Sequence, residues 1–210
     1  MYTIDLFNNR ANEYDSWYSK HQLLAKSEED TIKALGLSGL GLDVGAGSGF
    51  FTRLINAIAL EPSPGMIKLA KDRTWAVVSG VGELMPIRDS SMDYVIIVVT
   101  LCFAMNPEAI LRESIRVLKS NGRLVACIVP LESQWGALYS ELGSRGHPYY
   151  SRARFLTIKQ VTEALIRLGV RVTGYVATLS RGVGEYYEAP SVINNSDAGR
   201  YGFVCVNAVK

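Results

Sequence analysis

The sequence predicts an α/β domain built on a doubly wound, mostly parallel sheet. Apolar segments of strand length alternate with helix-length segments from residue 40 to residue 170, a pattern typical of right-handed crossovers. The run Tyr94–Val99 is apolar without interruption, as in a strand buried on both faces. The segment 42–49, LDVGAGSG, leads from a buried strand into a turn with glycine at alternate positions. Such a strand and turn commonly hold a nucleotide-like ligand.

The N-terminal third of the chain is expected to contain helices followed by the first strands. Apolar residues at helical spacing predict two helices, the second of which stops at Gly36. Ser63 is a suitable N-cap for a later helix, and Pro64 suits its first position. The predicted elements are helices over 8–20 and 22–35, a strand over 40–44, a short helix over 50–55, a strand over 57–60 and a helix over 64–72.

The remaining elements continue the alternation and then depart from it. Asn106 is expected to cap a helix, and Asn121-Gly122 to form a turn. The last two strands have no helix between them, so we expect them to pair antiparallel. The predicted elements are strands over 75–79, 93–100 and 123–129, helices over 107–118 and 157–168, strands over 170–179 and 201–209, and a loop over 194–199.

Composition narrows the functional class. The 22 basic and 20 acidic residues give a net charge of +2, which does not call for nucleic acid or an anionic membrane as partner. No apolar run reaches the roughly 20 residues of a membrane span, and the N-terminus lacks a signal-peptide pattern. Cys102, Cys127 and Cys205 lie in or beside apolar segments without metal-ligand spacing. We interpret them as buried free thiols of a cytoplasmic protein, and we expect no metal site.

Several motifs follow the ends of predicted strands, where open α/β sheets bind ligands. The glycine turn lets a ligand lie against bare backbone, although close packing alone could also require its glycines. Glu61 follows Gly49 by twelve residues and could accept both hydroxyls of a ribose. Its alternative role is that of a solvent-exposed carboxylate at a helix start. The segment 80–86, GVGELMP, could hold a flat ring, and 89–93, DSSMD, leads into the central strand.

Together these segments resemble a class I S-adenosylmethionine-dependent methyltransferase, in the branch related to ubiquinone and menaquinone biosynthesis. The resemblance covers residues 7–180, and the chain most resembles small prokaryotic members without an assigned substrate. The matching segments are 7–15 (FNNRANEYD), 42–49 (LDVGAGSG), 61–66 (EPSPGM), 80–86 (GVGELMP), 91–95 (SMDYV) and 116–124 (RVLKSNGRL).

The resemblance implies a seven-stranded sheet in the order 3-2-1-4-5-7-6 with strand 7 antiparallel, and S-adenosylmethionine as cofactor. Glu61 would hold the ribose, and Tyr14 would close the site as part of a lid. Val81 departs from the family, because many relatives carry an acidic residue there. The implied cofactor-binding residues are Tyr14, Asp43, Gly45, Ala46, Gly47, Glu61, Pro62, Met66, Val81, Gly82, Glu83, Thr100 and Leu101.

Residues 130–156 have no strong periodicity and are long for a connection, so we expect an insertion that forms a lid over the acceptor. His147 could be a general base or a solvated loop residue. The basic residues between 142 and 162 could select an acidic acceptor or form a solvated face. Cys102 has no evident catalytic partner. The acceptor-site candidates are Tyr18, Phe103, Tyr139, His147, Tyr149, Tyr150, Arg152 and Arg154.

The sequence therefore predicts one methyltransferase domain over 1–210, with an N-terminal helical lid over 1–36. Its expected reaction is in-line methyl transfer to an N, O or C nucleophile of a small molecule, by a cytoplasmic monomer or homodimer; no catalytic residue is assigned. Two alternatives stay open. A binding or regulatory module would keep the cofactor without turnover. An NAD(P)-dependent oxidoreductase would require the motif G-x-G-x-x-G and an acidic residue about 20 positions after it, and this chain lacks that pattern.

Overall fold

The computed structural model describes residues 2–210, and within them eight strands form one sheet. The strand order is β3-β2-β1-β4-β5-β8-β6-β7. β1, β2, β3, β4 and β5 pair in parallel, whereas β8 runs antiparallel to both β5 and β6. The strands are β1 Gly41–Val44, β2 Ala57–Glu61, β3 Val77–Ser79, β4 Met92–Val98, β5 Leu118–Ile128, β6 Arg171–Thr178, β7 Ser191–Ile193 and β8 Phe203–Val209.

The predicted order is confirmed once β8 is counted as the seventh predicted strand. The short strand β7 at the edge of the sheet was not predicted, because only three residues pair and its Val192 is 85% exposed. The predicted loop over 194–199 is wrong in part, since it contains the single-turn helix α8, Asn195–Ala198. Neither element carries an apolar stripe that a sequence pattern could reveal.

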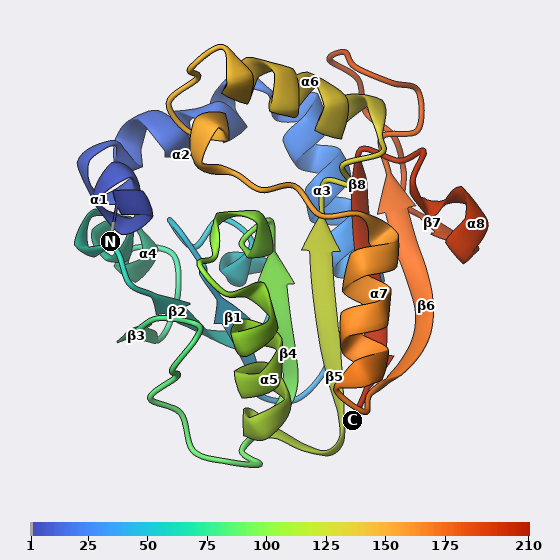
Figure 1. Ribbon diagram of the computed structural model, residues 1–210. Helices are drawn as coiled ribbons and strands as arrows, with labels where there is room; N and C mark the ends of the chain where they lie inside the picture. Colours follow the sequence, from blue (N-terminus) through green and yellow to red (C-terminus); the bar gives the residue numbers. More distant parts are fainter. Residues whose placement is uncertain (1) are drawn as a thin grey trace.

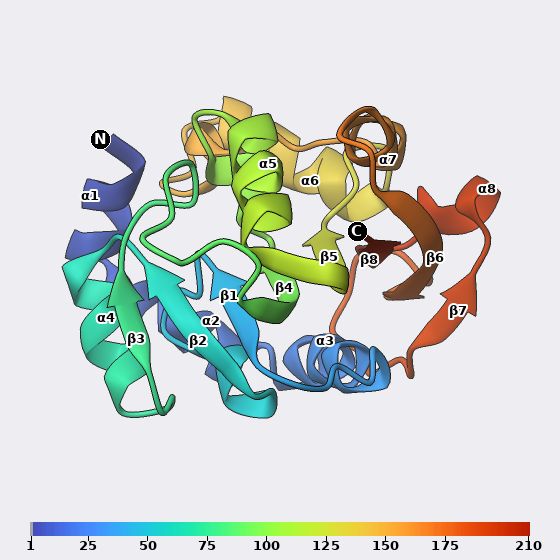
Figure 2. The same ribbon diagram turned by 90° about the horizontal axis from the view of Figure 1, so that it is seen from below.

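Helices cover both faces of the sheet and the edge at which the parallel strands end. α5 (Pro107–Val117) and α7 (Ile158–Arg167) lie on one face, and α3 (Gln22–Ala34) lies on the other with α4 (Pro64–Lys71), as Figure 2 shows. α1 (Tyr2–Asn9), α2 (Ala11–Lys20) and α6 (Gln134–Ser144) lie above the carboxyl ends of the strands (Figure 1). We call α1 and α2 together the roof.

N-cap residues mark the starts of three helices close to where the sequence predicts them. The Ser63 hydroxyl accepts from the Met66 amide at the start of α4, and the Asn106 side chain accepts from the Ala109 amide at the start of α5. Thr157 forms a capping box at α7. The N-terminal segment confirms the predicted break at position 21 but contains a further helix, α1, which a second break at position 10 separates from α2.

Two predictions on short segments are only partly confirmed. The first crossover contains only the single 3-10 turn η1, Thr52–Leu54, in place of a helix over 50–55. The predicted turn at 121–122 lies inside β5, which begins at Leu118. There the register against β4 shifts between Met92 and Tyr94, and Asn121 takes a φ of 61°. The chain accommodates the extra residues as an irregularity of the strand, with no separate turn.

The interpretation of all three cysteines as free thiols is wrong for two of them. Cys127 of β5 and Cys205 of β8 form a disulfide. They are register partners on adjacent antiparallel strands, so their side chains leave the same face opposite each other. A separation of 78 residues hides this pairing in the sequence. Cys102 is free and buried, as expected. No helix within residues 2–210 combines the length and apolarity needed to cross a bilayer.

Candidate functional site

A cavity of about 400 Å³ lies at the carboxyl ends of β1, β2 and β4, beneath the roof. Its walls come from the glycine turn, the start of α4, the segment after β3 and the segment after β4. It brings together residues up to 107 positions apart in the sequence, from Thr3 to Ile110. The predicted cofactor residues that line it are Tyr14, Asp43, Gly45, Ala46, Gly47, Glu61, Pro62, Met66, Val81, Gly82, Glu83 and Thr100, and the predicted acceptor residues that line it are Tyr18 and Phe103.

The glycine turn presents bare backbone to this cavity. Gly45 and Gly47 have φ values of 70° and 56°, a region that favours glycine. A Cβ on Gly45 would lie 2.3 Å from Thr100 Cγ2, so this glycine is needed for packing. A Cβ on Gly47 would meet nothing within 4 Å, so its outer side is open. Close packing therefore accounts for Gly45, whereas Gly47 leaves room for the predicted ligand.

Glu61 closes the floor of the cavity next to that turn. It is 6% exposed, so its alternative role as a solvent-exposed helix-start carboxylate is wrong. Its Oε2 accepts from the Gly47 amide and its Oε1 from the Ser63 amide, both at 2.9 Å. Burial raises the pKa of Glu61, and the hydrogen bonds from the two backbone amides oppose that rise. Each carboxylate oxygen keeps a lone pair for a further donor.

Asp43 is a second buried carboxylate on the cavity wall. Its Oδ2 accepts from Thr52 Oγ1 at 2.6 Å. Burial raises its pKa to about 7; the Thr52 hydrogen bond lowers it and the charge of Glu61 raises it further. No ion pair within residues 2–210 involves Asp43 or Glu61. Two carboxyl groups without a cation make this end of the cavity favourable for a positively charged ligand.

The segment after β4 forms the opposite wall under strain. Val99, which lines the cavity, has a φ of 51°, and a β-branched residue rarely adopts such a conformation. The Thr100 hydroxyl donates to the Gly45 carbonyl at 3.2 Å and so ties this segment to the glycine turn. Leu101 is 1% exposed and packs in the core without lining the cavity. Burial raises the pKa of the Cys102 thiol to about 12, which keeps it protonated.

The roof is attached to the glycine turn and to α4 by polar contacts. Asp15 of α2 accepts from the Ser48 hydroxyl at 2.5 Å and from both terminal nitrogens of Arg73. This pairing lowers the pKa of Asp15. The Asn8 side chain of α1 accepts from the Gly65 amide at 2.8 Å. These contacts hold the roof over the cavity.

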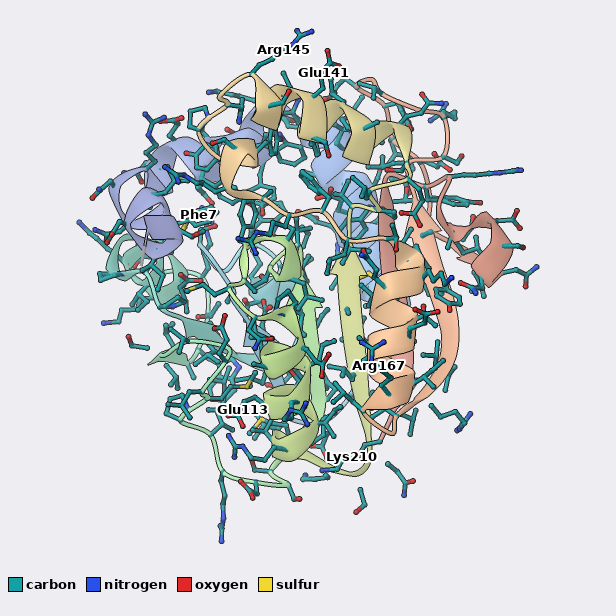
Figure 3. All side chains as sticks on the ribbon, viewed as in Figure 1. Phe7, Glu113, Glu141, Arg145, Arg167 and Lys210 are labelled. Carbon is teal, nitrogen blue, oxygen red and sulfur yellow. A yellow bond between two sulfur atoms is a disulfide. The ribbon has the colours of Figure 1, made fainter. Side chains whose placement is uncertain are left out.

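Aromatic rings fill the space between the roof and the segment 130–156. Phe7 lies 5.1 Å from the rings of both Tyr14 and Phe103, measured between centroids. Its label in Figure 3 marks it on the roof above the strand ends. Tyr149 packs against Phe7 and Tyr14, at centroid distances of 5.8 Å and 5.2 Å. Tyr149 therefore contacts the roof, although it does not line the cavity.

The other acceptor-site candidates lie farther from the cavity. Tyr150 stacks between Tyr139 and His147, with both centroid distances 4.3 Å. Arg152 and Arg154 are exposed. The neighbouring basic residue Arg145 pairs with Glu141 on the outer side of α6, where Figure 3 labels both. These arginines match the solvated face that the sequence left as an alternative.

Some residues at the site were missed by sequence reasoning. α1 contributes Thr3, Ile4 and Phe7 to the cavity, although the sequence prediction began the first helix at Asn8. Glu28 of α3 is also buried, and no motif includes it. Its signal was available, because Leu24, Glu28 and Ile32 are spaced by four residues and share one face of the helix. An acid on an otherwise apolar face is unusual.

Comparison with known proteins agrees with this geometry. A family model described as "Methyltransferase domain" matches residues 42–126. A structure from Thermotoga maritima, described as a SAM-dependent methyltransferase and possible histamine N-methyltransferase, has a TM-score of 0.91 at 29% identity, covering 99% of both chains. The chain belongs to the S-adenosylmethionine-dependent methyltransferase family. An uncharacterized protein of Methanocaldococcus jannaschii is 32% identical over 99% of this chain and 100% of its own length.

The family resemblance predicted from the sequence is thereby confirmed, and the relatives include a quinone-related enzyme. A demethylmenaquinone methyltransferase of Tropheryma whipplei is 35% identical over 98 residues, which are 41% of this chain and 40% of that protein. This methyltransferase uses S-adenosylmethionine as its cofactor. The cavity suits that molecule, since it combines open backbone at Gly47, an acceptor at Glu61 and two carboxyl groups without a cation.

Proposed function

We propose that this methyltransferase transfers the methyl group of S-adenosylmethionine to a small-molecule acceptor inside the cavity beneath the roof. The observation that carries the proposal is the buried Glu61 carboxylate beside the open face of Gly47. Glu61 would accept the ribose hydroxyls, and the backbone at Gly47 would contact the methionine portion. When bound, the cofactor supplies a methyl group on a cationic sulfonium, which a nucleophile displaces in line.

The protein's own part in this reaction is to orient and to exclude water. Asp43 and Glu61 favour a positively charged ligand at one end of the cavity. Tyr14 and Phe103 also line the cavity, where aromatic rings can stabilise a cationic centre. The roof, attached through Asp15, would keep the reacting atoms dry. No metal is needed, and no three potential ligand residues within 2–210 lie together as a metal site.

We further propose that residues 1–36 and 130–156 form the lid of the acceptor site within a single domain. The support is the aromatic packing between Tyr149 and the roof residues Phe7 and Tyr14. Tyr150→Ala should leave cofactor affinity unchanged and lower kcat, because Tyr150 stacks within the insertion and does not line the cavity. Lost cofactor binding with normal turnover at saturation would contradict this assignment.

Isothermal calorimetry followed by a turnover screen tests the proposal. S-adenosylmethionine and S-adenosylhomocysteine should bind, and NAD should not. A panel of amines, phenols and quinones should then contain an acceptor that gains a methyl group. Cofactor binding without turnover on any compound would favour the binding-module alternative. Tight binding of NAD alone would overturn the cofactor site.

The proposed partners are those expected from the sequence: a small-molecule acceptor, neither nucleic acid nor membrane, and a monomer or homodimer. The sequence also predicts a cytoplasmic location. The near balance of charges supports the first part. The Cys127–Cys205 bond argues against a reducing compartment, because disulfides persist where the surroundings are oxidising. Thiol alkylation of protein taken directly from cells, followed by mass spectrometry, decides between these indications.

A further inference from the structure

Glu28 is a buried acid that the methyl-transfer site described above does not use. It lies on α3, and its side chain points away from solvent with only 8% exposed. Within residues 2–210 its carboxyl group has no hydrogen bond and no ion pair, whereas its neighbour Glu29 pairs with Arg53 and Lys33. Burying a carboxyl group without a partner is costly, so a position that keeps one calls for an explanation.

Four tyrosines from three elements lie on the side of α3 that carries this acid. Leu24 and Ile32, one turn before and after Glu28, share a buried cluster with Tyr18 and Tyr139. The ring of Tyr14 lies 6.4 Å from that of Tyr18, and the ring of Tyr150 lies 4.3 Å from that of Tyr139, measured between centroids. Tyr14 and Tyr18 come from α2, Tyr139 from α6 and Tyr150 from η3 (Tyr150–Arg152), and each interacts electrostatically with Glu28. We call Glu28 and these four tyrosines the Glu28 chamber. No arginine, lysine or histidine contributes to the electrostatic surroundings of Glu28. The chamber therefore offers one carboxyl group and several ring faces, without a cation.

The polar atoms of the chamber border open space. Two side-chain polar atoms of the described residues have neither accessible surface nor a hydrogen-bond partner. They are Tyr94 Oη and Trp135 Nε1. The oxygens of Glu28 and the hydroxyls of Tyr14 and Tyr18 also lack hydrogen bonds to other described residues, yet they are not among the sealed atoms. These atoms therefore keep some surface accessible to solvent, which pairing with a ligand requires.

The chamber adjoins the cavity through two shared residues. Tyr14 and Tyr18 line the cavity, whereas Glu28 lies behind them. The charge of Glu28 contributes to the raised pKa of both tyrosines, after the larger effect of burial. Phe7 and Phe103 continue the aromatic wall from Tyr14 towards the segment after β4. A small acceptor could thus lie across this boundary, with its nucleophile between Glu28 and the reacting centre.

We propose that the methyl acceptor is an amine whose nitrogen, protonated in solution, pairs with Glu28 inside the aromatic chamber. This rests on the proposed function, which it narrows from any small nucleophile to an amine. Ring faces attract cations, and a carboxylate supplies both the opposite charge and a hydrogen-bond acceptor. An acidic acceptor would meet a like charge here, while Arg152 and Arg154, which could have favoured it, point to solvent.

The proton balance of such a pairing is favourable. Burial raises the pKa of Glu28 to about 8. The tyrosines stay neutral, since burial raises the pKa of Tyr150 to about 12 and those of Tyr14, Tyr18 and Tyr139 further. A protonated amine that binds the neutral carboxyl group releases one proton to solvent, and the remaining proton is shared between nitrogen and Glu28.

Methyl transfer then needs a free electron pair on the nitrogen. With the shared proton on Glu28, the nitrogen's former N–H bonding pair is free to form the bond to the methyl carbon. The pair of the broken S–CH₃ bond stays on sulfur, which becomes a neutral thioether. The methylated nitrogen leaves as a cation, the Glu28 proton returns to solvent when the carboxyl group next binds an amine, and charge is conserved.

Calorimetry on protein saturated with S-adenosylhomocysteine tests the proposal without turnover. The probes are 2-phenylethylamine, tyramine and butylamine, each with the alcohol that replaces its amino group. At least one amine should bind at least about tenfold more tightly than its alcohol, and Glu28→Gln should abolish that preference. Titrations in buffers of different ionisation enthalpy should show release of one proton. Glu163→Gln, an exposed position on α7, serves as control and should keep the preference.

The outcomes separate this inference from the proposed function. If S-adenosylhomocysteine itself fails to bind the parent protein, the proposed function fails. If it binds normally and every alcohol matches its amine, or Glu28→Gln keeps the preference, the amine inference alone is overturned. A purely structural Glu28 would give a less stable Glu28→Gln variant with unchanged amine preference. Our proposal predicts instead an equally or more stable variant, because an unpaired buried acid has been removed.

Discussion

Replacing Glu61 by alanine should weaken S-adenosylmethionine binding by about two orders of magnitude while the protein stays folded. The carboxylate is buried and accepts from the amides of Gly47 and Ser63, which hold its oxygens towards the cavity. Hydrogen bonds to a charged group contribute about 1.5–3 kcal/mol each. Two ribose hydroxyls, each sharing an oxygen already bound to an amide, should therefore contribute about 3 kcal/mol together, or roughly a hundredfold in Kd.

The same substitution removes the acceptor of two amides, so its effect on folding must be measured alongside. We expect a loss of about 1–2 kcal/mol, because the enlarged cavity lets water reach both N–H groups. In a chain of this length that corresponds to a fall in Tm of roughly 2–8 °C. Isothermal calorimetry with S-adenosylmethionine gives the Kd, and Glu61→Gln provides a second variant of similar size. A folded Glu61→Ala protein with the parent's Kd would refute the ribose assignment.

Three further predictions follow from other features. Gly47→Ala should fold with a cost of about 1–2 kcal/mol for its left-handed backbone and bind cofactor less tightly, because the new methyl group enters open cavity space. Gly45→Ala should instead fail to fold stably, since its methyl group overlaps Thr100; equal melting temperatures of the two variants would contradict this. The pKa of Glu28 in the folded state, about 8, lies above its unfolded value near 4.3, so the folded state binds the Glu28 proton more tightly. The stability that this proton contributes is complete below about pH 4 and is lost as pH rises through 8. Melting curves from pH 5 to 9 should therefore show parent stability falling relative to Glu28→Gln, by about 5 kcal/mol at most; parallel curves would remove the buried-acid assignment. Reducing the Cys127–Cys205 bond, which closes a loop of 78 residues, should cost about 4 kcal/mol in denaturant unfolding, and an unchanged midpoint would show that the bond is absent in solution.

Strongly periodic or continuous patterns predicted the central elements well. The unbroken apolar run of β4 and the capping residues Ser63 and Asn106 led to elements that the structure confirms within a few residues. The glycine turn was predicted correctly because a ligand-binding turn requires glycine for reasons visible in one short segment. What depends on local chemistry can be predicted from a local pattern.

Features that depend on distant partners were not predictable in the same way. The disulfide joins strands whose pairing only the folded sheet defines. The aromatic chamber gathers side chains from α2, α3, α6 and η3, none of which signals the others. Glu28 was visible in the sequence as an acid on the apolar face of α3. Its role, however, depends on four tyrosines, two of which lie more than 100 positions away. β7 and α8 are too short for any periodicity to appear.

The contacts that hold the roof have a consequence for the order in which this protein folds. Asp15 contacts Ser48 and Arg73, which follow it by 33 and 58 positions. Asn8 contacts Gly65, which follows it by 57 positions. During synthesis these helices leave the ribosome before the segments on which they dock. Since helices this short are marginal by themselves in water, they settle only after the first crossover units have formed. The cavity beneath the roof is thus completed late in folding, by helices that precede its other walls in the sequence.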